Sequence, residues 1–327
     1  MALSGGSAVG QQSLAGKRVV VIKDKAPLAV SGQAAATASE GTVFTVDKVD
    51  GEWLWIKSER AYLRRGDVVP FEDAIGHYTR LLETNKTAHN YWNRAQIWRL
   101  KGELDIALGD MNDAIRLNPN ESVWFNHRGI LWKNKKDYDK VIADYSEAIR
   151  LNPKNGAAYH NRGSAWSAKK DYDKAISDYD EALKHTDPNE KVGVLSGSDI
   201  TGGDSTAMVN SRAVTLSSHG RVWRDMGDYD KAIADYEEAI RLDPKYESPR
   251  NGRRAVWSAQ KAWDKIISDC DADLRSKPQS ISLLSWRAWA WFRKDNFDKA
   301  LADSEEVIRI DPNNDYALGI RRDCWGE

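Results

Sequence analysis

Apolar and small residues recur at helical spacing through most of the chain, with polar residues between them. Tyr159, Gly163 and Trp166 are separated by four and three residues, which places them on one face of a helix. After a polar turn, a second apolar stripe begins at Ala175 and stops before Pro188, because proline cannot continue a helix. The pattern predicts two amphipathic helices here, neither of which can bury its apolar stripe alone.

The same pattern repeats every 34 residues and is marked by tryptophan. The first series is Trp98, Trp132 and Trp166, and the second is Trp223, Trp257, Trp291 and Trp325. The two series are offset by 57 residues, which is one period plus an insertion of 23. A fixed period of this length predicts stacked helix pairs that bury one another's apolar stripes.

This spacing resembles the tetratricopeptide repeat family, which has small residues at places 8, 20 and 27 of each unit, aromatic residues at places 4 and 11, and proline at place 32. The three small places read Ala95, Ala107 and Ala114 in the first unit. Six units are expected, with place 1 at Ala88, Ser122, Gly156, Ala213, Glu247 and Ile281. The resemblance implies a mainly α fold, an α-α superhelical solenoid over 87–327 with a capping half-unit at each end. The caps are expected at 71–86 and 315–327.

Residues 17–70 follow a different pattern, with short β-rich runs separated by Gly, Asp and Pro. They are expected to form a small β-barrel after a flexible segment at 1–16. The order of its β runs resembles bacterial SH3-like domains. Trp53 and Trp55 share one face of a strand, whose other face carries Leu54 and Ile56. One pair must be core. The tryptophan pair is either a ligand stripe or, as we favour, the surface that docks on the first repeat helix.

Composition excludes several classes of protein. The 48 Lys+Arg and 49 Asp+Glu give a net charge of −1, which offers no electrostatic reason to expect nucleic acid as a partner. No apolar run reaches the length of a membrane span, and the N-terminus does not resemble a secretory signal. A cytoplasmic location is the default expectation, and an extracytoplasmic one stays open if the N-terminus was trimmed.

Cys270 and Cys324 are expected to be buried free thiols.

No enzyme motif is found: there is no nucleophile elbow, phosphate-binding glycine loop, metal-ligand spacing or calcium loop. We therefore expect no catalysis, no cofactor and no metal. His127 and His160 lie on neighbouring predicted helices, but two imidazoles without a third ligand make a poor metal site.

Charged residues also follow the period. Place 7 is arginine in five of the six units, and His219 is the exception, while place 23 is always aspartate. A charged rail for a ligand and a structural Arg–Asp ladder are both compatible with this pattern. We favour the ladder, because partly buried charges are normally paired, and we expect each arginine to pair with a neighbouring unit. Arg321 would then reach Asp303.

The fifth unit breaks the small-residue rule, with Arg254 at place 8 and Asp273 at place 27. An ion pair in place of the small–small contact is one interpretation, and a splayed helix pair is the other.

The concave face of such stacks is lined by places 2, 5, 6, 9 and 12 of the first helices. The candidate peptide-binding residues at or beside these places are Trp92, Asn93, Gln96, Asn126, His127, Lys133, His160, Asn161, Ser164, Arg221, Asn251, Trp286 and Trp289. Asparagine amides both donate and accept, as an extended peptide backbone requires. The Lys and Asn pair with which related repeats clamp a peptide C-terminus is missing, so no chaperone tail is expected.

The insertion at 189–212 has the composition of a flexible loop and is expected to be either disordered or a lid. The whole pattern predicts a non-enzymatic scaffold that binds a protein or peptide partner in the concave groove. The alternative is a cell-wall or envelope-associated adaptor that binds its ligand through the barrel, with the repeats as a spacer.

Overall fold

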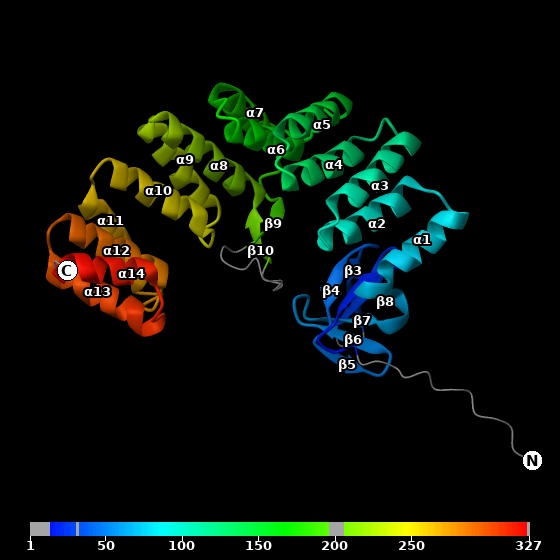
Figure 1. The fold of residues 1–327 in the computed structure, drawn as a ribbon, viewed down its shortest axis with the longest axis horizontal. Helices are drawn as coiled ribbons and strands as arrows, with labels where there is room; N and C mark the ends of the chain where they lie inside the picture. The colour runs from blue at the N-terminus through cyan, green and yellow to red at the C-terminus, as the bar shows by residue number, and fades with distance from the viewer. Residues whose placement is uncertain (1–13, 31–32, 196–205, 326–327) are drawn as a thin grey trace, which may run out of the picture. The chain divides into compact units, whose positions relative to one another are not determined.

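The structure is a computed structural model that describes residues 14–30, 33–195 and 206–325. It divides into two compact units, 1–170 with 195–207 and 171–194 with 208–327. Figure 1 shows strands at the start of the first unit, followed by helices. None of the helices in the described part of the chain is long and apolar enough to cross a membrane.

The described residues of the N-terminal β domain form eight short strands in two antiparallel sheets, ordered β4-β1-β8 and β3-β2-β7-β6-β5. The strands are β1 Arg18–Val21, β2 Ala26–Val30, β3 Gln33–Ala38, β4 Val43–Thr45, β5 Lys48–Asp50, β6 Trp53–Ile56, β7 Ala61–Arg64 and β8 Val68–Pro70. Leu54 and Ile56 are fully buried, and Trp53 and Trp55 on the opposite face of β6 are half-buried. The period-2 pattern therefore assigns the aliphatic pair to the core.

The β domain packs on the first helices through an apolar cluster. Val20 is buried together with Phe71, Tyr78 and Ile97, and the Tyr78 hydroxyl donates to the carbonyl of Val21 at 3.4 Å. Neither tryptophan of β6 belongs to this cluster. The prediction that Trp53 and Trp55 dock on the first repeat helix is therefore wrong, because the opposite sheet of the domain supplies the interface.

The helices of the first unit follow the predicted repeat. They are α1 Ala74–Thr84, α2 Ala88–Leu100, α3 Leu104–Leu117, α4 Ser122–Asn134, α5 Tyr138–Leu151 and α6 Gly156–Ala168. Ala95, Ala107 and Ala114 are completely buried. A Cβ on Gly129 would lie 3.0 Å from the Tyr145 ring, so place 8 must be small where the paired helices meet.

The described residues of the second unit form eight helices. The helices are α7 Tyr172–His185, α8 Ser211–Met226, α9 Tyr229–Leu242, α10 Glu247–Ala259, α11 Trp263–Leu274, α12 Ile281–Arg293, α13 Phe297–Ile310 and α14 Asp315–Trp325. Their N-termini are capped by short polar side chains: Asp171, Asp228 and Asn296 each accept a backbone N–H three residues ahead. Cys270 on α11 is buried as expected, whereas Cys324 is only half-buried.

The insertion differs from the predicted loop at both ends. Strands β9 Lys191–Leu195 and β10 Thr206–Asn210 pair with each other. Asn210 donates to the carbonyl of Pro188 at 2.6 Å and, as the N-cap of α8, accepts from the backbone of Ala213. The rest of the insertion, 196–205, lies outside the described residues, as do the expectations of a lid or disorder there.

Candidate functional site

The groove places of the first two repeats form an aromatic cluster rather than an open polar surface. The Trp92 ring lies 5.1 Å from His89 and 4.9 Å from His127 between centroids, and Trp124 lies 6.4 Å from Trp92. All four come from α2 and α4, because places 2 and 5 of one helix face places 3 and 6 of the next. Burial, with a smaller contribution from the Arg99 charge, lowers the pKa of His127 to about 4, so its imidazole is neutral at pH 7.

Arg99 stands beside this cluster without an acidic partner. Its Nε donates to Oε1 of Gln96 at 3.1 Å, and no carboxylate of the described residues forms an ion pair with it. Burial lowers the pKa of its guanidinium. A half-buried cation held only by a neutral amide can accept a further anionic or carbonyl partner.

Asn93 differs from the predicted groove position. It is completely buried, and its Nδ2 donates to Oε1 of Glu40 in the β domain at 3.0 Å. Gly41 makes this approach possible, since a Cβ there would lie 2.3 Å from Asn93 Oδ1. The prediction that Asn93 contacts a peptide is therefore corrected: this amide supports the contact between the β domain and α2.

Other predicted residues of the first unit remain on the surface. Asn126, His160, Asn161 and Ser164 are half-buried and Lys133 is exposed. The Ser164 hydroxyl donates back to the carbonyl of His160 at 3.0 Å, so that part of its hydrogen-bonding capacity is used within α6. Among the described residues, no three His, Cys, Asp or Glu side chains gather in a way that could hold a metal.

In the second unit, groove places of α8 and α10 surround a hollow of about 260 Å³. One wall comes from α8 and carries Ser217, Ser218, Arg221 and Arg224, and the other comes from α10 and carries Ser248, Asn251 and Gly252. These are places 5, 6, 9 and 12 of one repeat and places 2, 5 and 6 of the next. We call this hollow the α8–α10 pocket.

Tyr236 of α9 reaches the α8–α10 pocket between two glycines. A Cβ on Gly220 would lie 3.1 Å from its ring, and a Cβ on Gly252 would lie 2.4 Å from it. The ring is buried, and that burial raises the pKa of the phenol to about 12, so the hydroxyl keeps its proton. A small residue at place 6 of the fifth unit is the sequence signal for this approach. Tyr236 and Tyr246, which also lines the pocket, were missed because neither stands at a groove place.

The predicted tryptophans at the C-terminal end belong partly to the core. Trp286 packs against the core shared by α11 and α12. Trp289 is stacked on Phe292 with centroids 5.9 Å apart and lies 6.4 Å from the half-exposed ring of Tyr316. Only Trp289 is therefore part of a surface aromatic group.

Arginines at place 7 pair with aspartates of their own unit. Arg94 donates from Nε and Nη2 to the two carboxylate oxygens of Asp110 at 2.9 and 2.7 Å, and the same fork joins Arg128 to Asp144 and Arg287 to Asp303. The Asp110 carboxylate raises the pKa of Arg94. The prediction that the arginines pair with a neighbouring unit is wrong for these forks, because facing helices of one unit place the two groups in bidentate register.

The remaining nitrogen of each fork reaches the preceding unit. Nη1 of Arg128 donates to Asn112 Oδ1 at 2.8 Å, and Nη1 of Arg287 donates to Asp271 Oδ1 at 2.5 Å. Arg321 lies over the Trp325 ring and forms no ion pair with Asp303 among the described residues. These arginines are occupied by structural partners. The polar residue at place 25 was the signal for this second contact.

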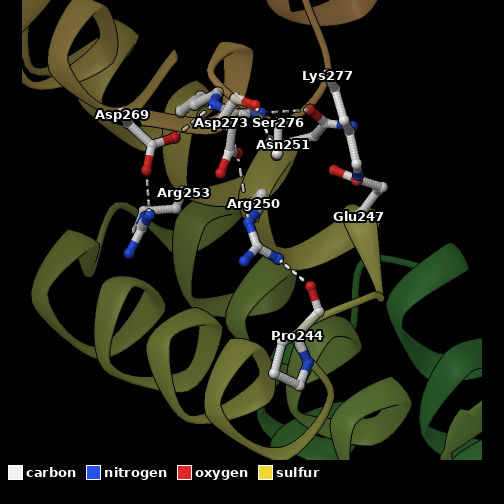
Figure 2. A network of polar contacts seen from close by, with 10 residues as sticks. Pro244, Glu247, Arg250, Asn251, Arg253, Asp269, Asp273, Ser276 and Lys277 are labelled. Carbon is white, nitrogen blue, oxygen red and sulfur yellow. Dashed lines mark hydrogen bonds and ion pairs between the residues drawn. The ribbon is translucent and has the colours of Figure 1, made fainter. Parts of the chain in front are cut away.

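Of the two interpretations of the fifth unit, the structure contains the ion pair. Arg254 is completely buried and donates to Asp269 Oδ2 at 2.6 Å and to Asp273 Oδ2 at 2.7 Å. Figure 2 shows contacts of neighbouring residues, in which Arg253 pairs with Asp269 and Arg250 donates to the carbonyl of Pro244; the second of these hydrogen bonds measures 2.8 Å.

The outer face of β6 and β7 forms a second candidate surface. Trp55 and Tyr62 are cross-strand partners with ring centroids 4.8 Å apart. The Arg64 guanidinium lies over the Trp53 ring at 5.3 Å. Trp53 and Tyr62 line a hollow of about 210 Å³. We call these four residues the aromatic stripe.

Comparison with known proteins identifies the repeats. The family model described as tetratricopeptide repeat matches residues 156–189 and 220–246. A comparison with curated proteins found no significant match. The chain therefore contains tetratricopeptide repeats, which generally mediate protein–protein interaction.

Solved structures share the fold at low sequence identity. The C-terminal part of a TPR repeat-containing protein from Cytophaga hutchinsonii is 18% identical, with a TM-score of 0.53 over 76% of this chain and 94% of its own. PilF of Pseudomonas aeruginosa is 14% identical, with a TM-score of 0.52 over 77% and 99%. A tetratricopeptide repeat protein from Parabacteroides merdae is 15% identical, with a TM-score of 0.52 over 80% and 93%. The chain is a mainly helical repeat solenoid preceded by a β-rich region.

Proposed function

We propose that the chain is a non-enzymatic scaffold that binds a peptide segment of a partner protein on the first-helix face of its repeats. The α8–α10 pocket carries this proposal, because it is a hollow lined by groove places of two successive units. Arg94, Arg128 and Arg287 of the charged rail at place 7 are not available for this role, since they already hold aspartates.

Binding would use a surface that is ordered before the ligand arrives. The serine and asparagine side chains at the pocket rim can donate and accept, which suits the alternating groups of an extended backbone. Because the helix pairs hold these groups in place, the protein loses little conformational freedom on binding.

The test is capture of a partner from a lysate of the source organism by three full-length baits. Ser218→Phe fills the α8–α10 pocket, and Ser268→Phe puts the same side chain on the exposed face of α11 as a matched control. A partner that binds the wild-type chain and the control variant but not Ser218→Phe supports the groove. Equal capture by all three baits would contradict it.

The aromatic stripe favours a second candidate, in which the β domain binds a cell-wall glycan or peptide, as the resemblance to bacterial SH3-like domains suggests. Its rings are half-buried and are not used in the contact with the helices. Co-sedimentation with purified cell-wall sacculi, lost in Trp53→Ala and kept in Ser218→Phe, would favour this function. Absence of co-sedimentation with the wild-type chain would reject it.

A further inference from the structure

We propose that the α8–α10 pocket is a carboxylate anchor, and that the groove selects acidic peptides by holding an Asp or Glu side chain between Arg221 and Arg224. This inference rests on the proposed groove function and adds the chemical class of its ligand.

Arg221 is an exposed cation without an ion pair or hydrogen bond among the described residues. Among the residues that the structure describes, Arg224 donates hydrogen bonds only to its sequence neighbour Asp225, at 2.8 and 3.1 Å, and such an exposed pair contributes little. The two arginines are three residues apart on α8, so both guanidinium groups can reach one ligand. None of the described residues that line the pocket carries a carboxylate.

The other lining groups add hydrogen-bond donors. Asn251 Oδ1 accepts from Arg254 Nη1 at 3.3 Å, which fixes the amide and leaves its Nδ2 group without a hydrogen bond to a described residue. Ser217 and Ser248 share one hydrogen bond across the pocket at 3.3 Å. The protonated Tyr236 hydroxyl enters beside Gly252. A pocket with more donors than acceptors fits an anionic oxygen ligand.

Charge is distributed unevenly between the groove and the rest of the chain. None of the six units carries Asp or Glu at places 2, 5, 6, 9 or 12, whereas Arg99, Lys133, Arg221 and Arg224 stand there. The chain as a whole has a net charge of −1. The groove is therefore basic on an otherwise balanced protein, and this favours an acidic partner.

A carboxylate fits this charge better than a phosphate group. Asp225 already offsets part of the Arg224 charge, so the pocket has about one uncompensated positive charge. A side-chain carboxylate carries one negative charge, whereas a phosphoserine carries about −1.5 to −2 at pH 7.

The experiment measures binding of fluorescein-labelled short peptide pools to the full chain. One pool carries Asp and Glu, a second carries Asn and Gln at the same positions, and a third carries phosphoserine. The variants are Arg221→Ala, Arg221→Lys and the control Arg241→Ala, which removes an exposed arginine paired with Glu238 on α9. We expect the acidic pool to bind at least about tenfold more tightly than the amide pool. We also expect Arg221→Ala to remove that preference, Arg221→Lys to restore part of it, and Arg241→Ala to leave it unchanged.

The other outcomes distinguish failure of the anchor from failure of the groove. Equal binding of the acidic and amide pools, unaffected by Arg221→Ala but lost in Ser218→Phe, would overturn the anchor and leave the groove. Tightest binding of the phosphoserine pool would replace the carboxylate with a phosphate. Binding of no pool by the wild-type chain would count against both the anchor and the groove.

Discussion

His127 shows how one half-buried side chain makes stability depend on pH. Its pKa falls from the ordinary 6.5 to about 4 in the folded chain. Above about pH 6.5 the imidazole is neutral in both the folded and the unfolded chain, so its titration does not reduce the free energy of unfolding. Below that pH the unfolded chain binds a proton that the folded chain does not, so the free energy of unfolding falls as pH falls towards 4.

We predict that His127→Gln reduces this pH dependence. Between about pH 7 and pH 5 the wild-type chain should lose about 2 kcal/mol more stability than the variant, because each pKa unit corresponds to about 1.4 kcal/mol. Urea unfolding followed by tryptophan fluorescence at both pH values measures the difference. Identical pH dependence in the two proteins would show that folding does not lower the pKa of His127.

Arg254 carries a second residue-level prediction. We expect Arg254→Ala to destabilise the second unit by about 3 kcal/mol or more, because it leaves the carboxylates of Asp269 and Asp273 in a partly buried site with less compensation. The double variant with Asp273→Ala should be more stable than Arg254→Ala, since it removes one of those carboxylates. Thermal unfolding compares the variants, and a double variant less stable than the single one would contradict the ion-pair explanation.

At the scale of elements, the first helix of every unit ends in the same way. Place 15 has a left-handed backbone throughout, at Gly102, Lys136, Lys170, Gly227, Lys261 and Asp295. Glycine takes this conformation without strain, whereas other residues lose about 1 kcal/mol in it. Four of the six helix ends therefore carry a residue that the conformation disfavours.

Lys261→Gly should consequently stabilise the chain by about 0.5–1 kcal/mol, after allowance for the greater freedom of glycine in the unfolded state. The control is Gln260→Gly at the preceding residue, whose backbone is right-handed helical and whose side chain is exposed. That variant should lose stability. Urea unfolding measures both, and a loss of stability in Lys261→Gly would contradict the argument.

At the scale of the whole molecule, the β domain acts as a cap of the repeats as well as a candidate ligand module. Its Val20 and Val69 cover Phe71, Tyr78 and Ile97 of the first helical region. The hydrogen bond between Asn93 and Glu40 adds a partly buried polar contact to the same interface.

Deletion of 1–70 should therefore lower the thermal midpoint and promote aggregation. Exposure of Ile97 alone costs about 1.5–3 kcal/mol. Trp53→Ala, on the opposite face of the β domain, serves as the control and should keep the wild-type midpoint. Differential scanning calorimetry with light scattering measures both effects, and an unchanged midpoint in the truncated chain would show that the repeats need no such cover.

The helix pairs of each repeat could be predicted from the sequence, because the face that a side chain occupies on a helix depends on residues only three or four positions away. Side chains three and four residues apart share a helix face, so the period of 34 and the small residues of each helix pair follow directly from the sequence. The Arg254–Asp273 pair was predictable for the same reason: it replaces a small–small contact at known places. The alternation in 53–56 likewise required one face of that strand to be core.

The candidate site could be predicted only in outline. The groove places of α8 and α10 were identified from the register, but the entry of Tyr236 beside Gly252 depends on how three helices pack. Asn93 stands at a groove place of its repeat, but its side chain is buried against the β domain and hydrogen-bonds to Glu40 there. The sequence could not show this, because the two segments are far apart along the chain.

The sequence by itself determined the repeat, the helix pairs, the basic residues of the groove and the absence of recognised enzyme motifs. Only the tertiary structure decided which aspartate each arginine holds, which face of the β domain meets the helices and where the first-helix face is hollow. The physical reason is the sequence separation over which each feature is determined. Helix faces depend on spacing along the chain, whereas ion-pair partners and pockets depend on distances between segments that the sequence separates.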